Sequence, residues 1–256
     1  MKHGDFTDLA DNYAKYRPGY APMVLDAFVG LIDKKIQKIH GADVGAGTGI
    51  WSRQMADKGF DIYAVEPNDA MRKQGILQNG SYNIKWFDGS AEDTGLKESS
   101  CDFVTMASSF HWPDFNKAIK EFARILKPSG YFMALWNTRH YEINPLLVDI
   151  ENKLHVIVPG MKRISSGRSE FCENLTQRLN DNIYFDDVLY LEGTHKESQS
   201  IGRYIGIWES VNDIRVQAGN EKFNMFIDYI REKTKNLNFI EVEYITRAWI
   251  AKCKNI

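Results

Sequence analysis

A glycine-rich stretch constrains the fold of this chain more than any other feature. Residues Asp43–Gly49 read DVGAGTG and follow a short apolar run that is typical of a β-strand. Because glycine has no Cβ atom, closely spaced glycines let the backbone turn tightly and let a ligand lie directly against it. We therefore predict a strand that ends in a nucleoside-binding loop, and a cofactor-dependent enzyme is the first hypothesis.

The position of the third glycine indicates which nucleoside binds. Dinucleotide-binding loops have the spacing G-x-G-x-x-G, which would require a glycine at Ile50. The apolar Ile50 removes the usual seat for a pyrophosphate, so a nicotinamide dinucleotide is less favoured. The acid followed by G-x-G-x-G resembles the first motif of the class I S-adenosylmethionine-dependent methyltransferases. This resemblance implies that S-adenosylmethionine is the cofactor and that its candidate binding residues include Asp43, Gly45, Ala46, Gly47 and Gly49.

Length and composition exclude several other classes. The chain has 256 residues, enough for one elaborated domain with a sizeable core. It has 34 acidic and 32 basic residues and no basic stripe, so we expect no nucleic-acid partner. No apolar run approaches the ~20 residues that span a bilayer, and the cysteines form no C-x-x-C pair. We therefore expect a soluble, cytoplasmic protein with reduced thiols and neither a membrane segment nor a structural metal.

Apolar runs alternate with amphipathic stretches between residues 39 and 137, as in repeated βαβ units around a mostly parallel sheet. We therefore predict an α/β, doubly wound fold. Strands are expected over 39–44, 62–65, 84–87, 103–106 and 131–136. Helices are expected over 50–58, from Asn68 onward and over 115–126, and the KPSG sequence of residues 127–130 is expected to form a turn.

The second half of the chain alternates less regularly. We expect a helix over 146–156, a polar segment over 163–182, a strand near 184–191, a helix marked by Phe223, Phe226, Ile227 and Ile230, and a final strand over 239–251. The resemblance implies a seven-stranded Rossmann-like sheet with one reversed strand. Within a single methyltransferase domain over 1–256 we expect an N-terminal helical cover (1–35), a cofactor-binding core (36–137), an inserted helical cap and substrate region (138–215), and a closing helix and edge strand (216–256).

Glu66 ends the second predicted strand, 21 positions after Gly45. In such folds a carboxylate at this place accepts hydrogen bonds from ribose hydroxyls. We predict that Glu66, with Pro67 beside it, binds the ribose of the cofactor. The alternative is an acid that only stabilises the start of the following helix.

The acidic segment Asp88–Asp93 follows the third strand, at the edge where open α/β sheets bind ligands. It resembles the methyltransferase segment that contacts adenine, with Ser90, Ala91 and Glu92 as candidate contacts. Many relatives have an acid where Ser90 stands, so the backbone of Ala91 or the side chain of Glu92 would replace that contact. An acidic surface turn is the alternative.

Small and then aromatic residues follow the fourth strand in Met106–Trp112, which reads MASSFHW. This segment resembles that of the type 11 methyltransferases, including the trans-aconitate methyltransferase-like subgroup, which act on small molecules. The resemblance implies that Ser108 lies where donor and acceptor meet. His111 is a candidate general base, since an imidazole titrates near pH 6.5, or else a packed wall residue. Trp112 is expected to pack.

The sequence YAKYRP of Tyr13–Pro18 resembles the Y-x-x-Y-R-P stretch that covers the amino-acid end of the cofactor in those relatives. Tyr16 and Arg17 are therefore candidate binding residues, because a hydroxyl or a guanidinium can bind a carboxylate. An aromatic helix packed on the edge of the domain is the alternative. Arg163 and Arg168 are candidates for gripping an anionic acceptor, or are solvated loop charges.

Together these motifs predict an enzyme that transfers a methyl group from S-adenosylmethionine to a small-molecule acceptor, at a carboxylate or hydroxyl group and without a metal. Two alternatives stay open. One is a module that binds the cofactor without turnover, and the other is a nucleotide-dependent oxidoreductase. The sequence does not indicate the acceptor or the oligomeric state.

Overall fold

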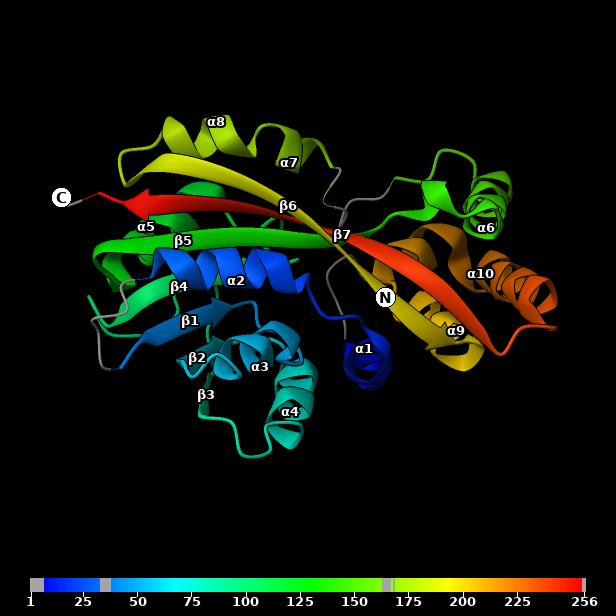
Figure 1. Cartoon of the computed structure of the whole chain (residues 1–256), viewed down its shortest axis with the longest axis horizontal. Helices are drawn as coiled ribbons and strands as arrows, with labels where there is room; N and C mark the ends of the chain where they lie inside the picture. The colour runs from blue at the N-terminus through cyan, green and yellow to red at the C-terminus, as the bar shows by residue number, and fades with distance from the viewer. Residues whose placement is uncertain (1–6, 33–37, 163–166, 168, 255–256) are drawn as a thin grey trace.

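The computed structural model describes residues 7–32, 38–162, 167 and 169–254. Within these ranges seven strands form one sheet in the order β3-β2-β1-β4-β5-β7-β6. Figure 1 shows the sheet running across the molecule, with helices against its faces and a group of helices at one end. The elements are η1 (Thr7–Leu9), α1 (Ala10–Tyr16), α2 (Pro22–Leu31), β1 (His40–Val44), α3 (Ile50–Ala56), β2 (Asp61–Val65), α4 (Asp69–Leu77), β3 (Ile84–Phe87), β4 (Cys101–Ala107), α5 (Phe115–Ile125), β5 (Leu126–Arg139), η2 (Tyr141–Ile143), α6 (Pro145–Ile157), α7 (Glu170–Glu173), α8 (Leu175–Asn180), β6 (Phe185–Ser200), α9 (Ile201–Glu209), α10 (Asn212–Thr234) and β7 (Phe239–Cys253).

The first five strands are parallel and the last strand is reversed. β1 pairs with β2 and β4, β2 pairs with β3, and β4 pairs with β5, all in parallel. β7 is antiparallel to both β5 and β6. The central strand β4 is buried at every position except its last, as expected for a parallel strand that is covered on both faces. The predicted doubly wound fold and its single reversed strand are confirmed.

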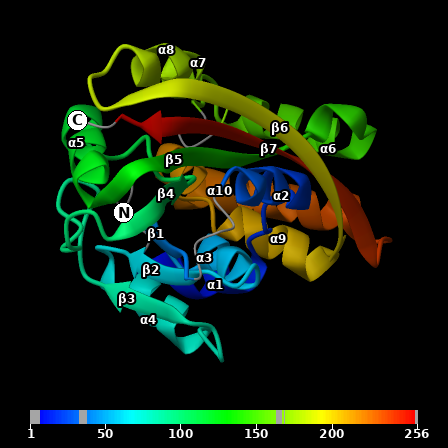
Figure 2. The ribbon, with the colours of Figure 1, turned by 60° about the vertical axis from the view of Figure 1, so that its left-hand side comes forward.

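Helices cover the two faces of the sheet with separate apolar cores. One core joins the sheet to α2 and α3 through side chains such as Phe28 and Trp51. The other joins it to α5, α7 and α8 through Phe122, Leu175 and Leu179. Figure 2 shows α5, α7 and α8 grouped apart from α2 and α3. Loops at the ends of the strands are therefore held from both sides, which gives a binding site a rigid frame.

A third apolar core forms a helical cap at one end of the sheet. It joins α6, α9 and α10 to the start of β7, with Trp208 and Phe226 fully buried in edge-to-face contact. The predicted apolar face of α10 is buried, including Phe223 and Ile230. Figure 1 shows α9 beside α1, where the N-terminal segment meets the cap. α10 crosses the expected boundary at residue 215, and β6, within the expected cap, is a strand of the sheet.

One local prediction was wrong. Residues 127–130 do not form a turn between a helix and a strand but lie inside β5, where the register shifts between the pairs Cys101–Leu126 and Phe103–Tyr131. Ser129 takes a left-handed φ of 61° in this bulge. The turn residues are therefore accommodated as an irregularity of a continuous strand.

The helix α2 lies within the expected N-terminal cover (1–35), although no separate helix was predicted there. Pro22 occupies the first helical position, where a missing N–H costs nothing. The helix buries Val24, Leu25 and Phe28 against the sheet. The N-terminal segment thus combines α1, an extended stretch and α2, and this arrangement places its middle over the ends of β1 and β4.

Candidate active site

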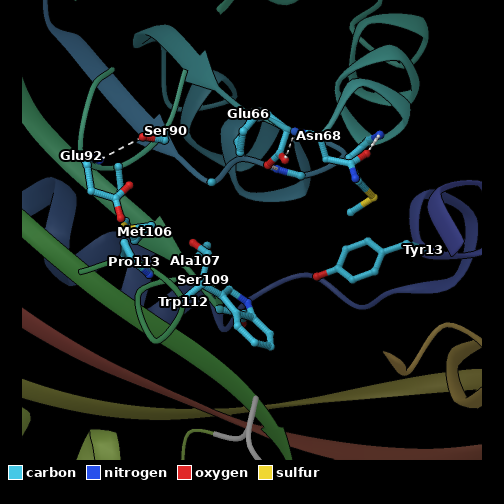
Figure 3. A pocket seen from close by; sticks show the side chains of 16 residues that line it. Tyr13, Glu66, Asn68, Ser90, Glu92, Met106, Ala107, Ser109, Trp112 and Pro113 are labelled. Carbon is cyan, nitrogen blue, oxygen red and sulfur yellow. Dashed lines mark hydrogen bonds between the residues drawn. The ribbon is translucent and has the colours of Figure 1, made fainter. Parts of the chain in front are cut away.

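Three adjoining cavities lie at the carboxyl ends of the parallel strands. The first has a volume of about 290 Å³ and the other two about 60 Å³ each. Tyr13 and Ser108 line all three. Figure 3 shows the first cavity, with Glu66 and Asn68 on one side, Trp112 on the other, and the Tyr13 hydroxyl pointing inward. Ligand groups bound in the three cavities would therefore meet at Ser108 and Tyr13.

The glycine loop forms the floor of the first two cavities. Gly45, Gly47 and Gly49 all have left-handed φ angles, of 67°, 58° and 76°, which explains the spacing of the glycines. A Cβ atom at Gly47 would meet only the Met71 methyl group, at 3.3 Å, because its other side faces open space. The backbone N–H of Gly45 donates to Val65 O at the end of β2 (2.8 Å). The hydrogen bond to β2 thus fixes the loop on one side, and the open face of Gly47 leaves its backbone accessible to a ligand on the other.

Glu66 links the loop to the end of β2. Its carboxylate accepts from the N–H of Gly47 at 2.7 Å and from the N–H of Asn68 at 2.8 Å, one bond on each oxygen. Each oxygen keeps a second lone pair, so the carboxylate can still accept two hydroxyl donors. Burial raises the pKa of Glu66, and the two N–H donors act in the opposite direction. Glu66 and Pro67 both line the first cavity.

Asp43 lies under the loop rather than in a cavity wall. It is 1% exposed and accepts from the Ser52 hydroxyl on α3 at 2.5 Å. The hydroxyl of Thr105 on β4 lies 3.4 Å from its other oxygen. Burial raises the pKa of Asp43 to about 7, while these hydroxyl donors lower it. These contacts join β1 to α3 and β4, and Asp43 lines none of the three cavities, so the structure does not place this predicted binding residue in contact with a ligand.

Ser90, Ala91 and Glu92, the predicted adenine contacts, line the far end of the first cavity. The Ser90 hydroxyl accepts from the N–H of Glu92 at 3.2 Å, and the Glu92 carboxylate accepts from the N–H of Asp114 at 2.9 Å. Both polar side chains therefore have backbone partners that shape the turn. The apolar wall here comes from Ala91 and Met106.

Ser108 lies at the junction of the cavities with an unusual backbone. Its φ is 57°, which non-glycine residues rarely adopt, and its N–H donates to Leu135 O at 2.7 Å. The Tyr20 hydroxyl lies 3.0 Å from its Oγ. Tyr20 and Arg17 line the second cavity beside Ala46.

Two buried donors in the second cavity have no hydrogen-bond partner in the described part of the chain. They are the Thr48 hydroxyl and the Trp51 indole N–H, on side chains that are 1% and 2% exposed. Leaving a buried donor unpaired costs about 1 to 3 kcal/mol. Such donors indicate that a ligand with an acceptor group, such as a carboxylate, completes this cavity. Sequence reasoning missed both residues, because Thr48 stands between two glycines that drew attention to the backbone and Trp51 reads as part of an apolar helix face.

The structure does not place His111 in the wall of any of the three cavities. Its Nδ1 accepts from the Trp136 indole N–H at 3.3 Å, and its buried Nε2 has no partner among the residues described. Burial lowers the pKa of His111 to about 4, against a raising effect of Asp213. The ring is therefore neutral at pH 7, and its accepting nitrogen is already used. These contacts favour the alternative of a packed residue behind the wall.

The predicted binding residues of the N-terminal segment differ in where their side chains lie. One lines the cavities, and another packs against the cap. Arg17 lines the second and third cavities, and its guanidinium donates to Ser210 Oγ at 2.9 Å. Tyr16 is turned away, because its ring packs against Gly206 of α9. Tyr13, a member of the same motif, lies in the site instead. Arg163 and Arg168 fall outside the described residues.

Several residues of the site carried no sequence prediction. Asn68 and Met71 follow Glu66 along the chain, so their place beside the ribose position could have been inferred from helix α4. Trp112 lines two cavities and is 39% exposed, although it was expected to pack. Asn212 and Asp213 come from the start of α10. No local pattern in the sequence marks these last two, since only the folding of the cap brings them to the site.

No group of histidines, cysteines and acids that could hold a metal occurs among the described residues. The described helices include none that is long and apolar enough to cross a membrane. Cys101, Cys172 and Cys253 are buried and free, as predicted.

Residues 42–134 match the family model of a methyltransferase domain. An uncharacterized methyltransferase of Mycobacterium tuberculosis is 33% identical over 127 residues, which cover 50% of this chain and 49% of that protein. The chain thus spans about half the length of the first curated relatives it matches.

Solved structures share the fold over most of the chain. A type II methyltransferase from Anaeromyxobacter dehalogenans has a TM-score of 0.66 at 19% identity, covering 91% of this chain and 97% of that one. Phosphoethanolamine N-methyltransferase 2 of Haemonchus contortus, in complex with phosphomonomethylethanolamine and S-adenosylhomocysteine, has a TM-score of 0.53 at 12% identity, covering 97% of this chain and 57% of that one. With the glycine loop and Glu66 inside the matched range and joined by a hydrogen bond, residues 42–134 are identified as a methyltransferase domain.

Proposed function

We propose that the protein transfers a methyl group from S-adenosylmethionine to a small-molecule acceptor. The observation that carries the proposal is the meeting of three cavities at Ser108 and Tyr13. They would separate the adenosine, the amino-acid end and the acceptor, so that the sulfonium centre lies at their junction. Holding donor and acceptor in line and excluding water is the main task of such a site.

The residues of the first cavity fit an adenosine group. Glu66 would bind the ribose hydroxyls, while Ala91 and Met106 would pack on adenine in a wall shaped by Ser90 and Glu92. The open face of Gly47 would let the ribose approach the backbone. Pro67 would form part of the same wall.

The residues of the second cavity fit the charged amino-acid end of the cofactor. The unpartnered donors of Thr48 and Trp51, together with Arg17, would bind its carboxylate. When bound, the cofactor supplies a methyl group activated by a positively charged sulfur. The chain itself would align this methyl group with the acceptor, with the glycine loop on one side and Ser108 on the other.

The finer assignments of location and partner are proposals as well. Three free cysteines suit a reducing compartment, which supports a cytoplasmic location. A small acceptor is supported by the size of the third cavity, about 60 Å³, which admits one functional group rather than a macromolecular segment.

Two measurements test the proposal. Incubation with methyl-labelled S-adenosylmethionine and small-molecule extracts should give labelled product and an equal amount of S-adenosylhomocysteine. Binding of S-adenosylhomocysteine without any transfer would favour a module that only binds the cofactor. Binding of NAD in its place would favour the oxidoreductase.

A further inference from the structure

Trp112 is a large aromatic side chain that is open to solvent beside the proposed methyl position. It is 39% exposed. Four other tryptophans are at most 5% exposed: Trp51, Trp136, Trp208 and Trp249. A single exposed apolar side chain on an open surface needs no explanation. Trp112 instead lines the first and third cavities, where an open indole offers a surface that a ligand can cover.

The Trp112 indole is held in place from behind. The backbone N–H of Trp112 donates to Ser109 O at 3.1 Å, which closes a tight turn after β4. The indole packs against the His111 ring, with the two centroids 4.4 Å apart. His111 Nδ1 accepts in turn from the indole of Trp136, which is 1% exposed on β5. This wall is therefore fixed before a ligand binds, which lowers the entropy cost of binding.

The proposed cofactor position leaves the indole available to an acceptor. Trp112 does not line the second cavity, so the amino-acid end of the cofactor would not contact it. In the first cavity Glu66 and Asn68 lie on the side opposite Trp112 (Figure 3). The third cavity, about 60 Å³ in volume, admits the reacting group of an acceptor but not the rest of the molecule. The rest would therefore lie where the first and third cavities adjoin, at Trp112.

The charged groups of the third cavity are already engaged. The Arg17 guanidinium donates from Nε to Ser210 Oγ at 2.9 Å and from a terminal nitrogen to Ser210 O at 3.2 Å. It also lies over the Tyr13 ring, 4.7 Å from the centroid. Asp213, which lines the same cavity, has interaction partners as well. Neither charge is therefore held in reserve for the body of an acceptor.

The surface around Trp112 is aromatic and apolar. Pro113 follows it in the wall of the first cavity, and Tyr13 lines both cavities with it. Figure 3 shows the Tyr13 ring reaching in from α1 toward the indole. Aromatic rings in offset-stacked or edge-to-face contact gain about 2- to 10-fold in affinity beyond the effect of buried area. An aromatic ring therefore fits this surface better than a strongly hydrated group does.

We propose that the acceptor carries an aromatic ring that stacks on the Trp112 indole, while its reacting group enters the third cavity beside Ser108. The inference rests on the proposed methyl transfer and names the acceptor class for it. Trp112 selects the acceptor by binding it and takes no part in the transfer of the methyl group. Its contribution should therefore appear in the acceptor KM rather than in kcat.

The structure of the labelled product tests the acceptor class. Wild-type protein is incubated with tritiated-methyl S-adenosylmethionine and a small-molecule extract, and the labelled products are identified by ultraviolet absorbance and mass spectrometry. The expected product contains an aromatic ring. A labelled product without an aromatic ring would overturn the inference and leave methyl transfer intact. No labelled product at all, from protein that binds S-adenosylhomocysteine, would defeat the proposed function itself.

Substitution of the indole tests the residue. Trp112→Ala should raise the KM of the identified acceptor by about 5- to 150-fold, the range that stacking on an aromatic side chain provides. Its kcat and its affinity for S-adenosylhomocysteine, measured by calorimetry, should stay within about threefold of wild type, which also shows that the variant is folded. Phe239→Ala is the matched control, because it removes an aromatic side chain that is 63% exposed at the start of β7. It should retain the wild-type KM.

Trp112→Phe is the second variant, since a phenyl ring can still stack and should restore most of the acceptor affinity. An acceptor KM of Trp112→Ala within about twofold of wild type would overturn the role, because that change is smaller than stacking provides. Loss of S-adenosylhomocysteine affinity by about tenfold or more in Trp112→Ala would also overturn it, since the indole would then bind the cofactor.

Discussion

The Tyr20 hydroxyl lies 3.0 Å from Oγ of Ser108, which ties the segment before α2 to the junction of the three cavities. Ser108 is the residue with a left-handed φ that lines every cavity, so a small shift of its side chain would reach all three. The same segment is bonded to β5 through Asn137, whose side chain donates to Gly19 O at 2.8 Å. The N-terminal segment is thus part of the site rather than a cover laid over a finished domain.

Replacing Tyr20 by Phe removes the bond to Ser108 and keeps the ring. We expect a loss of about 0.5 to 1.5 kcal/mol in the free energy of unfolding and weaker binding of S-adenosylhomocysteine. The control is Tyr229→Phe, which removes a bond to Asp149 in the cap, 2.8 Å long. That variant should lose similar stability and bind S-adenosylhomocysteine as the wild type does. Equal affinity in both variants would separate Tyr20 from the site.

Replacing Trp51 by Phe removes one unpartnered donor from the second cavity. If the indole binds the cofactor carboxylate, affinity for S-adenosylhomocysteine should fall by about 1.5 to 3 kcal/mol, the usual worth of a bond to a charged group. Affinity for 5′-methylthioadenosine, which has no amino-acid end, should not change. Trp249→Phe is the control, because its indole donates to Thr176 on the other side of the sheet. An equal loss of affinity for S-adenosylhomocysteine and for 5′-methylthioadenosine would contradict the assignment of the Trp51 indole to the cofactor carboxylate.

Replacing Glu66 by Ala removes the proposed ribose contact. We expect S-adenosylhomocysteine binding to weaken by about 1 to 3 kcal/mol, because buried hydroxyl groups lose their acceptor. Loss of the bond to the Gly47 N–H would add to this effect by loosening the loop. The exposed Glu98→Ala is the control. Unchanged affinity, measured by calorimetry, would remove Glu66 from the site.

His111 makes stability depend on pH. Its pKa is lowered from 6.5 to about 4 in the folded protein, so the unfolded chain binds a proton first as pH falls. The stability contributed by the neutral ring is present above pH 6.5 and is lost between pH 6.5 and 4. As the pH is lowered through 5, the free energy of unfolding of the wild type should therefore fall more steeply than that of His111→Phe. The difference between the two slopes should be about 1 kcal/mol per pH unit. Identical slopes in urea titrations would show that the ring does not stay neutral.

The cofactor side of the site could be predicted from sequence because its determinants are local. Gly45 and Glu66 each stand directly after a strand, and adjacent parallel strands bring their ends together whatever the rest of the chain does. The observed bond from the Gly47 N–H to Glu66 follows from that geometry. The strand positions were predicted for the same reason, since continuous apolar runs mark buried parallel strands.

The acceptor side could not be predicted, because long-range packing determines it. Asp213 reaches the third cavity only because Trp208 and Phe226 pack α9 and α10 into the cap. His111 looked available in sequence, and only the buried bond from Trp136 shows that its accepting nitrogen is used. Tyr16 and Tyr13 are equivalent members of one motif, and the turn of α1 decides that Tyr13 faces the site.

A sulfonium nucleoside cofactor and its acceptor should occupy the three cavities. Calorimetric titration of the wild-type protein with S-adenosylhomocysteine and, separately, with NAD measures which nucleoside binds. We predict one S-adenosylhomocysteine bound per chain with a Kd on the order of micromolar, about −8 kcal/mol, and no heat of binding with NAD. Binding of NAD without binding of S-adenosylhomocysteine would contradict the claim.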